Sequence, residues 1–289
     1  MTDQTPTETT RLALHALRIG PWLPTADALE AQADLIVEAT ARSAAGGARI
    51  AIFPENAMAS PHKRHVSRSA PEIDEADWTK VDWHALRAQL TRVADAARDN
   101  HISVIVGAIH DLGKGRRPHN CLYVISHTGE LETRYDKRFL STTEITYMYT
   151  PGTEPVLVQL AGLRIGLVIG LEALFPDFFT AYADDGADLV VAASHGGGIF
   201  EQLIRSYAVV NVMPVALVIP PLPSDASRTG VYGVDGSIAA AGDSSDETIV
   251  FADIPTRRAN ETFHYKARHG FYEDRLLPTE PRSLIRDRF

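Results

Sequence analysis

The amino-acid sequence predicts an α/β fold in which mixed β-sheets carry helices on their outer faces. Strand-like and helix-like segments alternate twice, in residues 12–109 and again in residues 156–219. The strands are short and apolar, whereas apolar residues recur at helical spacing in the longer segments. No low-complexity linker divides the chain, so we expect one domain over residues 11–255. A polar segment, residues 1–10, is expected to be disordered, and a charged tail, residues 256–289, follows the domain.

The first half of the chain supplies strands and helices in turn. A Thr N-cap signal and two closing glycines bound the first predicted helix, and a strong apolar face marks the second. A turn at residues 127–130 predicts a hairpin between two further strands. The predicted elements are strands at residues 12–16, 49–53 and 101–109, helices at 25–45 and 82–100, and hairpin strands at 120–126 and 133–135.

The second half repeats the alternation. Two strands joined by an Ala-Gly turn come first, and two helices and two buried strands follow. The predicted elements are strands at residues 156–160, 163–169, 188–193 and 214–219, and helices at 177–185 and 200–210. Residues 230–241 and 248–253 are predicted to form a last hairpin.

Composition and charge exclude several classes of protein. The chain has 289 residues and a formal charge of -9, which does not favour binding to nucleic acid. Its one dense basic stretch, residues 62–68, precedes an acidic run and reads as a solvated loop. No apolar run reaches the roughly 18–20 residues that span a bilayer, and no signal peptide is apparent. We therefore expect no membrane association and a cytoplasmic location.

Cysteine and histidine usage gives no sign of a metal or another cofactor. The single cysteine, Cys121, allows no disulfide within the chain and no Cys-x-x-Cys site. The 11 histidines include no His-Glu-x-x-His pair. Cys121 lies in an apolar strand, where a buried small side chain is the expected role. The sequence thus predicts neither a metal site nor a cofactor.

Four strand ends carry residues that are suited to catalysis. They hold Glu55, Lys137, Glu144 and the turn at residues 169–177. Catalytic groups in α/β folds gather beyond the carboxyl ends of strands. Taken alone, Glu55 fits a surface position equally well, and a solvated position is the better interpretation of an isolated lysine such as Lys137.

The same segments, in this order, resemble the nitrilase superfamily of carbon–nitrogen hydrolases. The motifs are FPEN at residues 53–56, HNCLYVISHTGEL at 119–131, YDKRFL at 135–140, PGTEP at 151–155, RIGLVIGLEALFPD at 164–177 and GVYGVDGSIAA at 230–240. The resemblance covers nearly the whole chain and implies a four-layer α-β-β-α sandwich. It also implies an active site of a glutamate, a lysine, a cysteine and a second glutamate. Matched by motif, these are Glu55 and Lys137, with Glu144 placed by its distance before PGTEP.

The resemblance fails at the nucleophile. The family's turn reads Arg-Ile-Gly-Leu-Leu-Ile-Cys-Tyr-Glu, and Glu172 fixes the register so that Gly170 falls on the cysteine position and Leu171 on the aromatic one. Glycine cannot form a covalent intermediate. The pocket is expected to include Leu171, Glu172 and His195, the last in the glycine-rich stretch that follows the strand at residues 188–193.

Three hypotheses explain the missing cysteine. One is an enzyme in which the retained acids and lysine act on a small amide, amine or related nitrogen compound without a covalent step. A second is an inactive homologue that binds a small ligand or a partner. A third is a cysteine-to-glycine variant of an amidase. Thiol-dependent amidase activity is not expected in any of them. The family resemblance also implies a homodimer or larger assembly. The C-terminal tail suits docking on another subunit, and docking on its own domain is equally compatible with its sequence.

Overall fold

The computed structural model describes residues 8–20, 23–222, 227–243 and 245–256. The predicted C-terminal tail therefore lies outside the described residues, apart from its first residue. The predicted disordered start is described only from residue 8 onward, and there the prediction is wrong at Thr9 and Thr10, which already belong to the first strand. They extend this strand because Thr9 and Thr10 pair with Pro255 and Ile254 of the last strand.

The first sheet has six strands in the order β12-β1-β2-β3-β4-β5. These strands are β1 (Thr9–Ala16), β2 (Ile50–Ile52), β3 (Ser103–His110), β4 (His119–Ile125), β5 (Leu131–Asp136) and β12 (Thr248–Pro255). The three strands β1, β2 and β3 are parallel. On either side of them, β12 pairs antiparallel with β1, β4 with β3, and β5 with β4. The carboxyl ends of the parallel strands therefore meet at one edge of the sheet.

The second sheet repeats this design in the order β11-β10-β9-β8-β7-β6. Its strands are β6 (Leu157–Leu160), β7 (Leu163–Ile169), β8 (Leu189–Ala193), β9 (Val215–Val218), β10 (Gly230–Tyr232) and β11 (Ile238–Ala241). Again three central strands, β7, β8 and β9, are parallel and the flanking pairs are antiparallel.

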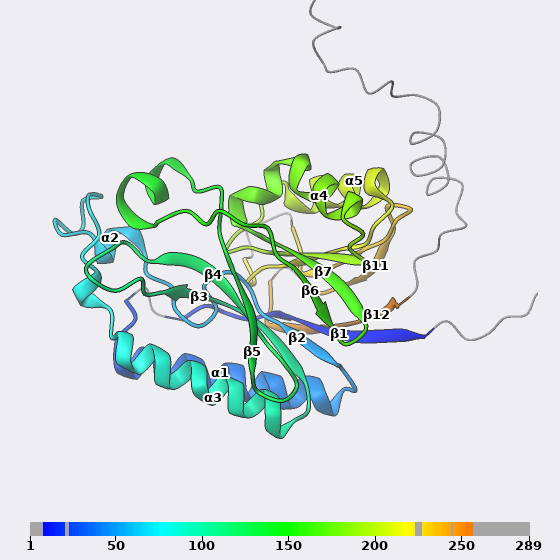
Figure 1. The fold of residues 1–289 in the computed structure, drawn as a ribbon, viewed down its shortest axis with the longest axis horizontal. Helices are drawn as coiled ribbons and strands as arrows, with labels where there is room; N and C mark the ends of the chain where they lie inside the picture. Colours follow the sequence, from blue (N-terminus) through cyan, green and yellow to red (C-terminus); the bar gives the residue numbers. More distant parts are fainter. Residues whose placement is uncertain (1–7, 21–22, 223–226, 244, 257–289) are drawn as a thin grey trace, which may run out of the picture. The chain divides into compact units, whose positions relative to one another are not determined.

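Helices cover the outer face of each sheet, which completes a four-layer α-β-β-α sandwich (Figure 1). The long helices are α1 (Ala26–Ala45) and α3 (Trp83–Asp99) on the first sheet and α4 (Pro176–Asp184) and α5 (Phe200–Asn211) on the second. The predicted cap of α1 is present, because the Thr25 side chain accepts a hydrogen bond from the Ala28 N–H. The predicted fold class is thus confirmed. Shorter helical turns are α2 (Lys63–Val66), η1 (Trp78–Lys80), η2 (Glu144–Met148) and η3 (Gly170–Leu174).

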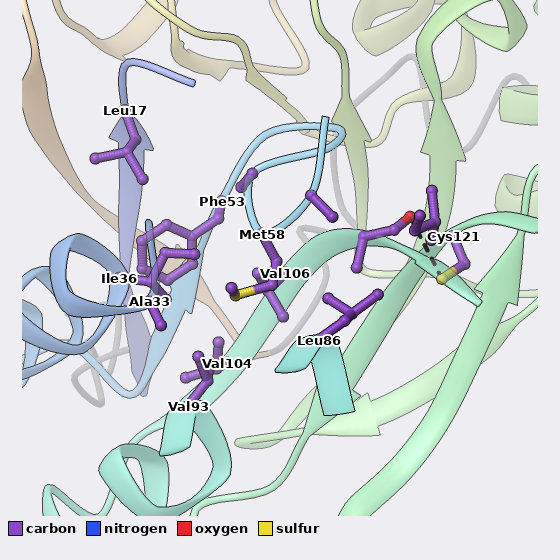
Figure 2. Packing of buried hydrophobic residues seen from close by; sticks show 14 of the residues in the cluster. Leu17, Ala33, Ile36, Phe53, Met58, Leu86, Val93, Val104, Val106 and Cys121 are labelled. Atoms are coloured by element: carbon purple, nitrogen blue, oxygen red, sulfur yellow. Dashed lines mark hydrogen bonds between the residues drawn. The ribbon is translucent and has the colours of Figure 1, made fainter. Parts of the chain in front are cut away.

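Three hydrophobic layers separate the four layers of backbone. Strand residues alternate between them: Leu12 and Leu14 face the second sheet, whereas Ala13 faces the helices. Figure 2 shows the layer between the first sheet and its helices, where Ile36 of α1 and Val93 of α3 pack against strand residues. A third layer fills the space between the second sheet and α4 and α5.

The predicted last hairpin is wrong. Residues 230–241 form a hairpin by themselves, β10 and β11, in the second sheet. Thr248–Pro255 instead pairs along its whole length with β1 in the first sheet. The last strand therefore joins the two ends of the domain.

Within the described residues, no helix combines the length and the apolar character needed to cross a membrane.

Candidate active site

Glu55 lies at the carboxyl edge of the first sheet because the chain turns sharply after β2. The Ala57 N–H donates to the Pro54 carbonyl and closes this turn. The turn packs directly on Gly107 of β3, where a Cβ atom would lie 2.2 Å from the Pro54 carbonyl oxygen. A glycine at residue 107 is therefore needed for the turn to approach the strand. The Glu55 side chain is left pointing inward and only 5% of the residue is exposed.

Lys137 is held from both sides of its backbone directly after β5. Its N–H donates to the Asn120 carbonyl, and its own carbonyl accepts the N–H of Gly152. A Cβ atom at Gly152 would lie 2.2 Å from the Asp136 carbonyl oxygen. Residue 152 must therefore be glycine for the Pro-Gly segment to pack against the end of β5. Lys137 is 3% exposed. Its ammonium group is thus fixed rather than solvated.

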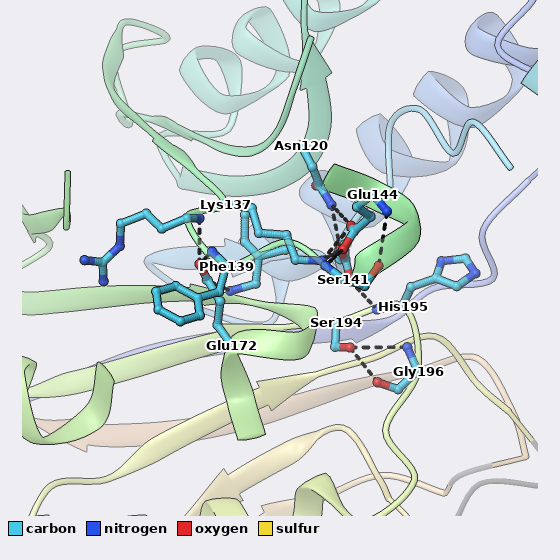
Figure 3. Close-up of polar contacts among 12 residues, drawn as sticks. Asn120, Lys137, Phe139, Ser141, Glu144, Glu172, Ser194, His195 and Gly196 are labelled. Carbon is cyan, nitrogen blue, oxygen red and sulfur yellow. Dashed lines mark hydrogen bonds and ion pairs between the residues drawn. The ribbon is translucent and has the colours of Figure 1, made fainter. Parts of the chain in front are cut away.

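The side chains of Glu55, Lys137 and Glu144 form one charged cluster, in which Glu55 and Lys137 are buried and Glu144 is partly buried (Figure 3). The Lys137 Nζ atom lies 3.0 Å from Glu55 Oε1 and 2.8 Å from Glu144 Oε1. Asn120 also donates to both acids, at 2.7 Å to Glu55 Oε1 and 3.4 Å to Glu144 Oε1. The four side chains come from four separate segments of the first sheet and its loops. The structure thus brings together the three charged residues that the sequence picked out.

Glu144 begins the π-helical turn η2, which follows the loop after β5. Its second oxygen, Oε2, accepts the Ser141 N–H at 2.7 Å. One carboxylate oxygen therefore faces Lys137 while the other is held by the loop. This geometry suits a residue that orients the lysine, whereas Glu55 has its Oε2 atom directed to the opposite side.

The contacts within the cluster determine the charge states of Glu55 and Lys137. Burial alone would raise the pKa of Glu55, but the Lys137 ammonium and the hydrogen bonds from Asn120 and Lys137 outweigh it and lower the pKa. Burial would lower the pKa of Lys137, but the carboxylates of Glu55 and Glu144 hold it above its ordinary value. Near neutral pH the site therefore contains a Glu55 carboxylate and a Lys137 ammonium ion. Such a pair supplies a proton acceptor beside a fixed positive charge.

Gly170 lies against this pair. It is the first residue after β7, has a φ of +54°, and begins η3. A Cβ atom built on it would lie 2.7 Å from Glu55 Oε2 and 3.0 Å from Lys137 Nζ. A side chain at residue 170 would therefore reach both charged groups, and Leu171, which follows on η3, is only partly buried.

Glu172 is placed differently from the other acids. Its Oε1 atom accepts the backbone N–H groups of Arg138 and Phe139, and its Oε2 atom accepts the Tyr135 hydroxyl and the Ile169 N–H. Burial raises its pKa despite these four donors. Glu172 thus links the segment after Lys137 to the residue before Gly170, and it does not join the charged cluster itself.

His195 contributes its backbone to the site. Its N–H donates to Glu55 Oε2 at 2.9 Å, while the imidazole ring points away from the carboxylates (Figure 3). Burial lowers the pKa of this imidazole. The sequence predicted a pocket residue here, and the structure assigns the contact to the main chain after β8.

Sequence reasoning missed Asn120, Gly107 and Gly152. A signal for Asn120 exists: it is a lone amide at the start of an apolar strand and is 1% exposed. Its neighbour Cys121 belongs to the layer that faces the helices, and burial raises its thiol pKa well above the ordinary value. The prediction that Cys121 is a buried small side chain is thus confirmed. No group of acids, histidines or cysteines among the described residues is arranged to hold a metal ion.

The sandwich with a buried Glu–Lys–Glu cluster at its sheet edge defines the class of C–N bond hydrolase folds, and comparison with known proteins gives the family. The model of the carbon-nitrogen hydrolase family matches residues 11–262, so the chain belongs to this family. Hydrolase Rv0480c of Mycobacterium tuberculosis is 30% identical over 249 residues, covering 80% of this chain and 81% of that protein. Nitrilase homolog 2 of Dictyostelium discoideum is 23% identical, covering 76% and 69%.

Solved structures share the fold at lower sequence identity. A variant of the amidase from Nesterenkonia sp. AN1, carrying the acetamide moiety of fluoroacetamide on its active-site cysteine, has a TM-score of 0.74 and 18% identity. The comparison covers 94% of this chain and 98% of the amidase. A variant of the same amidase in complex with butyramide has a TM-score of 0.73 and 19% identity, covering 91% and 97%.

Proposed function

We propose that this protein acts on a small amide or related nitrogen compound by acid/base chemistry that uses no cysteine. The observation that carries the proposal is the buried Glu55–Lys137–Glu144 cluster beside a residue without a side chain, Gly170. We infer that Gly170 stands where the family's nucleophilic cysteine stands. The motif order, the left-handed φ of Gly170 and its contact with both charged groups support this inference.

The chemistry follows from the charges. A carbonyl bound beside Gly170 would place its oxygen near the Lys137 ammonium, which stabilises the negative charge that develops on oxygen during attack. The Glu55 carboxylate accepts a proton from an attacking water and returns it to the leaving amine. Water and the amide thus yield a carboxylic acid and an amine, and no covalent bond to the enzyme is formed or broken. Glu144 keeps the lysine in place and ionised.

Retention of this cluster favours a catalyst over an inert fold. Two carboxylates and an ammonium ion are costly to bury, and a fold kept only for assembly gains little from them. The same cluster also suits the second hypothesis, a protein that binds a small polar nitrogen compound without converting it. The amidase with butyramide bound shows that a fold of this kind accommodates a small amide.

The experiment is a turnover and binding assay with a panel of small amides, nitriles and carbamoyl compounds. We expect the wild-type chain to release amine, and Glu55→Gln and Lys137→Met to reduce turnover at least about a hundredfold. Glu130→Gln, at an exposed position, is the matched control. Binding that depends on Glu55 and Lys137 without turnover would favour the binding homologue. If neither substitution alters turnover or affinity, both hypotheses fail.

Restoring the thiol separates the third hypothesis. Gly170→Cys places a sulfur beside a carboxylate base and a lysine, the set that thiol-dependent amide hydrolysis needs. If the chain is an amidase that lost its nucleophile by one substitution, this variant gains turnover that an alkylating reagent abolishes. Wild-type turnover that resists the reagent, with no gain in the variant, supports cysteine-free chemistry.

A further inference from the structure

A groove outside the charged cluster combines an aromatic wall with a basic rim. It has a volume of about 430 Å³ and runs between η1 and the loop after β3. Trp78 and Trp83 line it, with ring centroids 6.2 Å apart and planes tilted by 44°. Neither tryptophan contacts Lys137 or its two acids through any hydrogen bond of the described chain. The groove is therefore a separate feature.

The basic rim comes from two segments that are far apart in sequence. Arg68 follows α2, whereas Lys114, Arg116 and Arg117 belong to the loop that joins β3 to β4. This loop is tightly wound: Gly113, Lys114 and Gly115 have φ values of 64°, 54° and 69°. A left-handed φ is unfavourable for lysine and costs on the order of 1 kcal/mol.

The three acids of the groove already have partners. Glu75 forms a two-pronged ion pair with Arg117. Asp77 accepts the N–H and the hydroxyl of Thr79. Asp111 accepts the Gly113 N–H and lies 3.7 Å from Arg87, which is outside the groove.

Among the described residues, two cations of the rim, Lys114 and Arg116, are left without an acid, whereas the charge of Arg68 acts on Asp74 and Asp77. Among the residues that the structure describes, Arg68, Lys114 and Arg116 form no salt bridge. Unbalanced cations that converge on a hollow raise the local concentration of anions. Guanidinium groups also match the geometry of carboxylate and phosphate oxygens.

We propose that this groove is a binding site for a small anion that carries a flat apolar group, such as an aryl phosphate or aryl carboxylate. The tryptophans would contact the flat group, and Arg68, Lys114 and Arg116 would bind the charged oxygens. A ligand with only a charged group would contact only the basic rim, and a ligand with only a ring would contact only the tryptophans. A chain of net charge -9 gains such a site only through local clustering of its cations.

The groove adjoins the segment that carries Glu144. Arg117 donates from Nη1 to the Ile145 carbonyl, and the Ala76 N–H donates to the Tyr147 carbonyl. Trp78 also packs on Tyr149, with ring centroids 5.5 Å apart. An occupant of the groove therefore touches residues bonded to η2, although it is held by different side chains from those proposed to act on the nitrogen compound.

Tryptophan fluorescence provides a direct test, because two of the three tryptophans of the chain line the groove. We expect phenyl phosphate and benzoate to change the emission saturably. Neutral benzamide and inorganic phosphate should each bind at least about tenfold more weakly, since each lacks one of the two contacts. No saturation by phenyl phosphate up to about 10 mM, or equal binding of benzamide, would overturn the proposal.

Charge variants locate the site. The double variant Arg68→Gln, Lys114→Asn should weaken phenyl phosphate binding about tenfold or more, because asparagine tolerates the left-handed backbone. Arg49→Gln, which removes an exposed charge before β2, should bind like the wild type. Lys137→Met should also keep full affinity. Loss of binding in Lys137→Met with no loss in the double variant would place the anion in the charged cluster and refute the groove.

Discussion

Glu55 and Gly170 lie so close together that the first carbon of any side chain at residue 170 would be 2.7 Å from Glu55 Oε2. The carboxylate oxygen that accepts the His195 N–H therefore occupies space that a larger residue would claim. A carboxylate can rotate, whereas the backbone at residue 170 cannot change hand without disturbing η3. The identity of residue 170 and the position of Glu55 are thus coupled.

This coupling predicts the stability of substitutions at residue 170. The left-handed backbone alone should make Gly170→Ala lower the free energy of unfolding by about 1–2 kcal/mol. The contact with Glu55 should add a further loss. Gly47→Ala is the matched control, since Gly47 has a φ of +79° and open space around its Cβ position. Urea unfolding of both variants provides the comparison.

A double-mutant cycle isolates the contact itself. Glu55→Ala should reduce the cost of Gly170→Ala to that of Gly47→Ala, because the oxygen in the way is gone. If Gly170→Ala costs no more than Gly47→Ala while Glu55 is present, the two residues are not coupled.

Asn120 is expected to hold the pKa of Glu55 down. Its amide donates to Glu55 Oε1 at 2.7 Å, and a hydrogen bond to a charged group contributes about 1.5–3 kcal/mol. Asn120→Ala should therefore raise the pKa of Glu55. The measurement is a carbon NMR titration of the glutamate carboxyl groups. Asn100→Ala, which removes an amide hydrogen bond at the end of α3, should leave the pKa of Glu55 unchanged.

The sign of the resulting pH dependence is fixed. Because the folded-state pKa of Glu55 is lowered, its contribution to stability is present above its ordinary pKa of 4.5 and is lost as the pH falls through the folded value. Asn120→Ala moves that loss to higher pH. An unchanged carboxyl titration in Asn120→Ala would show that Lys137 alone sets the pKa of Glu55.

Gly152 should tolerate no side chain. A Cβ atom there would lie 2.2 Å from the Asp136 carbonyl oxygen, and backbone cannot give way as a flexible side chain can. Gly152→Ala is expected to lower the free energy of unfolding by about 1–3 kcal/mol. Gly196→Ala, whose Cβ would meet nothing nearer than 3.7 Å, should change it by about 0.5 kcal/mol or less. Similar values for the two variants would contradict a tight fit at Gly152.

His15 is expected to make the fold sensitive to mild acid. It is 2% exposed, stacks on Phe53 and pairs with the Ser43 hydroxyl, and burial lowers its pKa to about 3. Below about pH 6.5 the unfolded chain takes up a proton that the folded chain refuses, so stability falls as the pH falls.

The measurement for His15 is urea unfolding at pH 7 and pH 5. The wild type should lose about 2 kcal/mol more than His15→Gln over this interval. His127→Gln, at an exposed turn, should follow the wild type. An equal pH dependence in all three proteins would mean that His15 is ionised in the folded state.

Local sequence signals predicted most elements of the fold but not every pairing. The cap signals of α1 and the apolar face of α3 are local properties, and they indicated these helices correctly. The placement of β12 depends on β1, some 240 residues away, so a turn-based prediction assigned it to the wrong partner. Nothing within residues 248–253 distinguishes an outer strand of one sheet from that of the other.

Some residues of the candidate site could likewise be predicted from the sequence, and others could not. Glu55, Lys137 and Glu144 could be picked out because motif order and strand ends mark charged residues. Gly107 and Gly152 matter through the backbone that they allow to approach, which depends on packing and not on chemistry visible in sequence. Glu172 belongs to the same motif as Gly170, yet its four hydrogen bonds direct it to the framework. The expected homodimer or larger assembly stays a prediction.

The pairing of β1 with β12 also determines how long β1 stays exposed while the chain is being synthesised. Until residue 255 has left the ribosome, β1 has a free hydrogen-bonding edge over its eight residues, Thr9–Ala16. An unpaired, apolar strand of this length is a template for association between nascent chains. A chain whose synthesis stalls shortly before residue 248 would therefore expose this edge to other nascent chains. The edge is covered only when the last eight-residue strand has been made and pairs with β1.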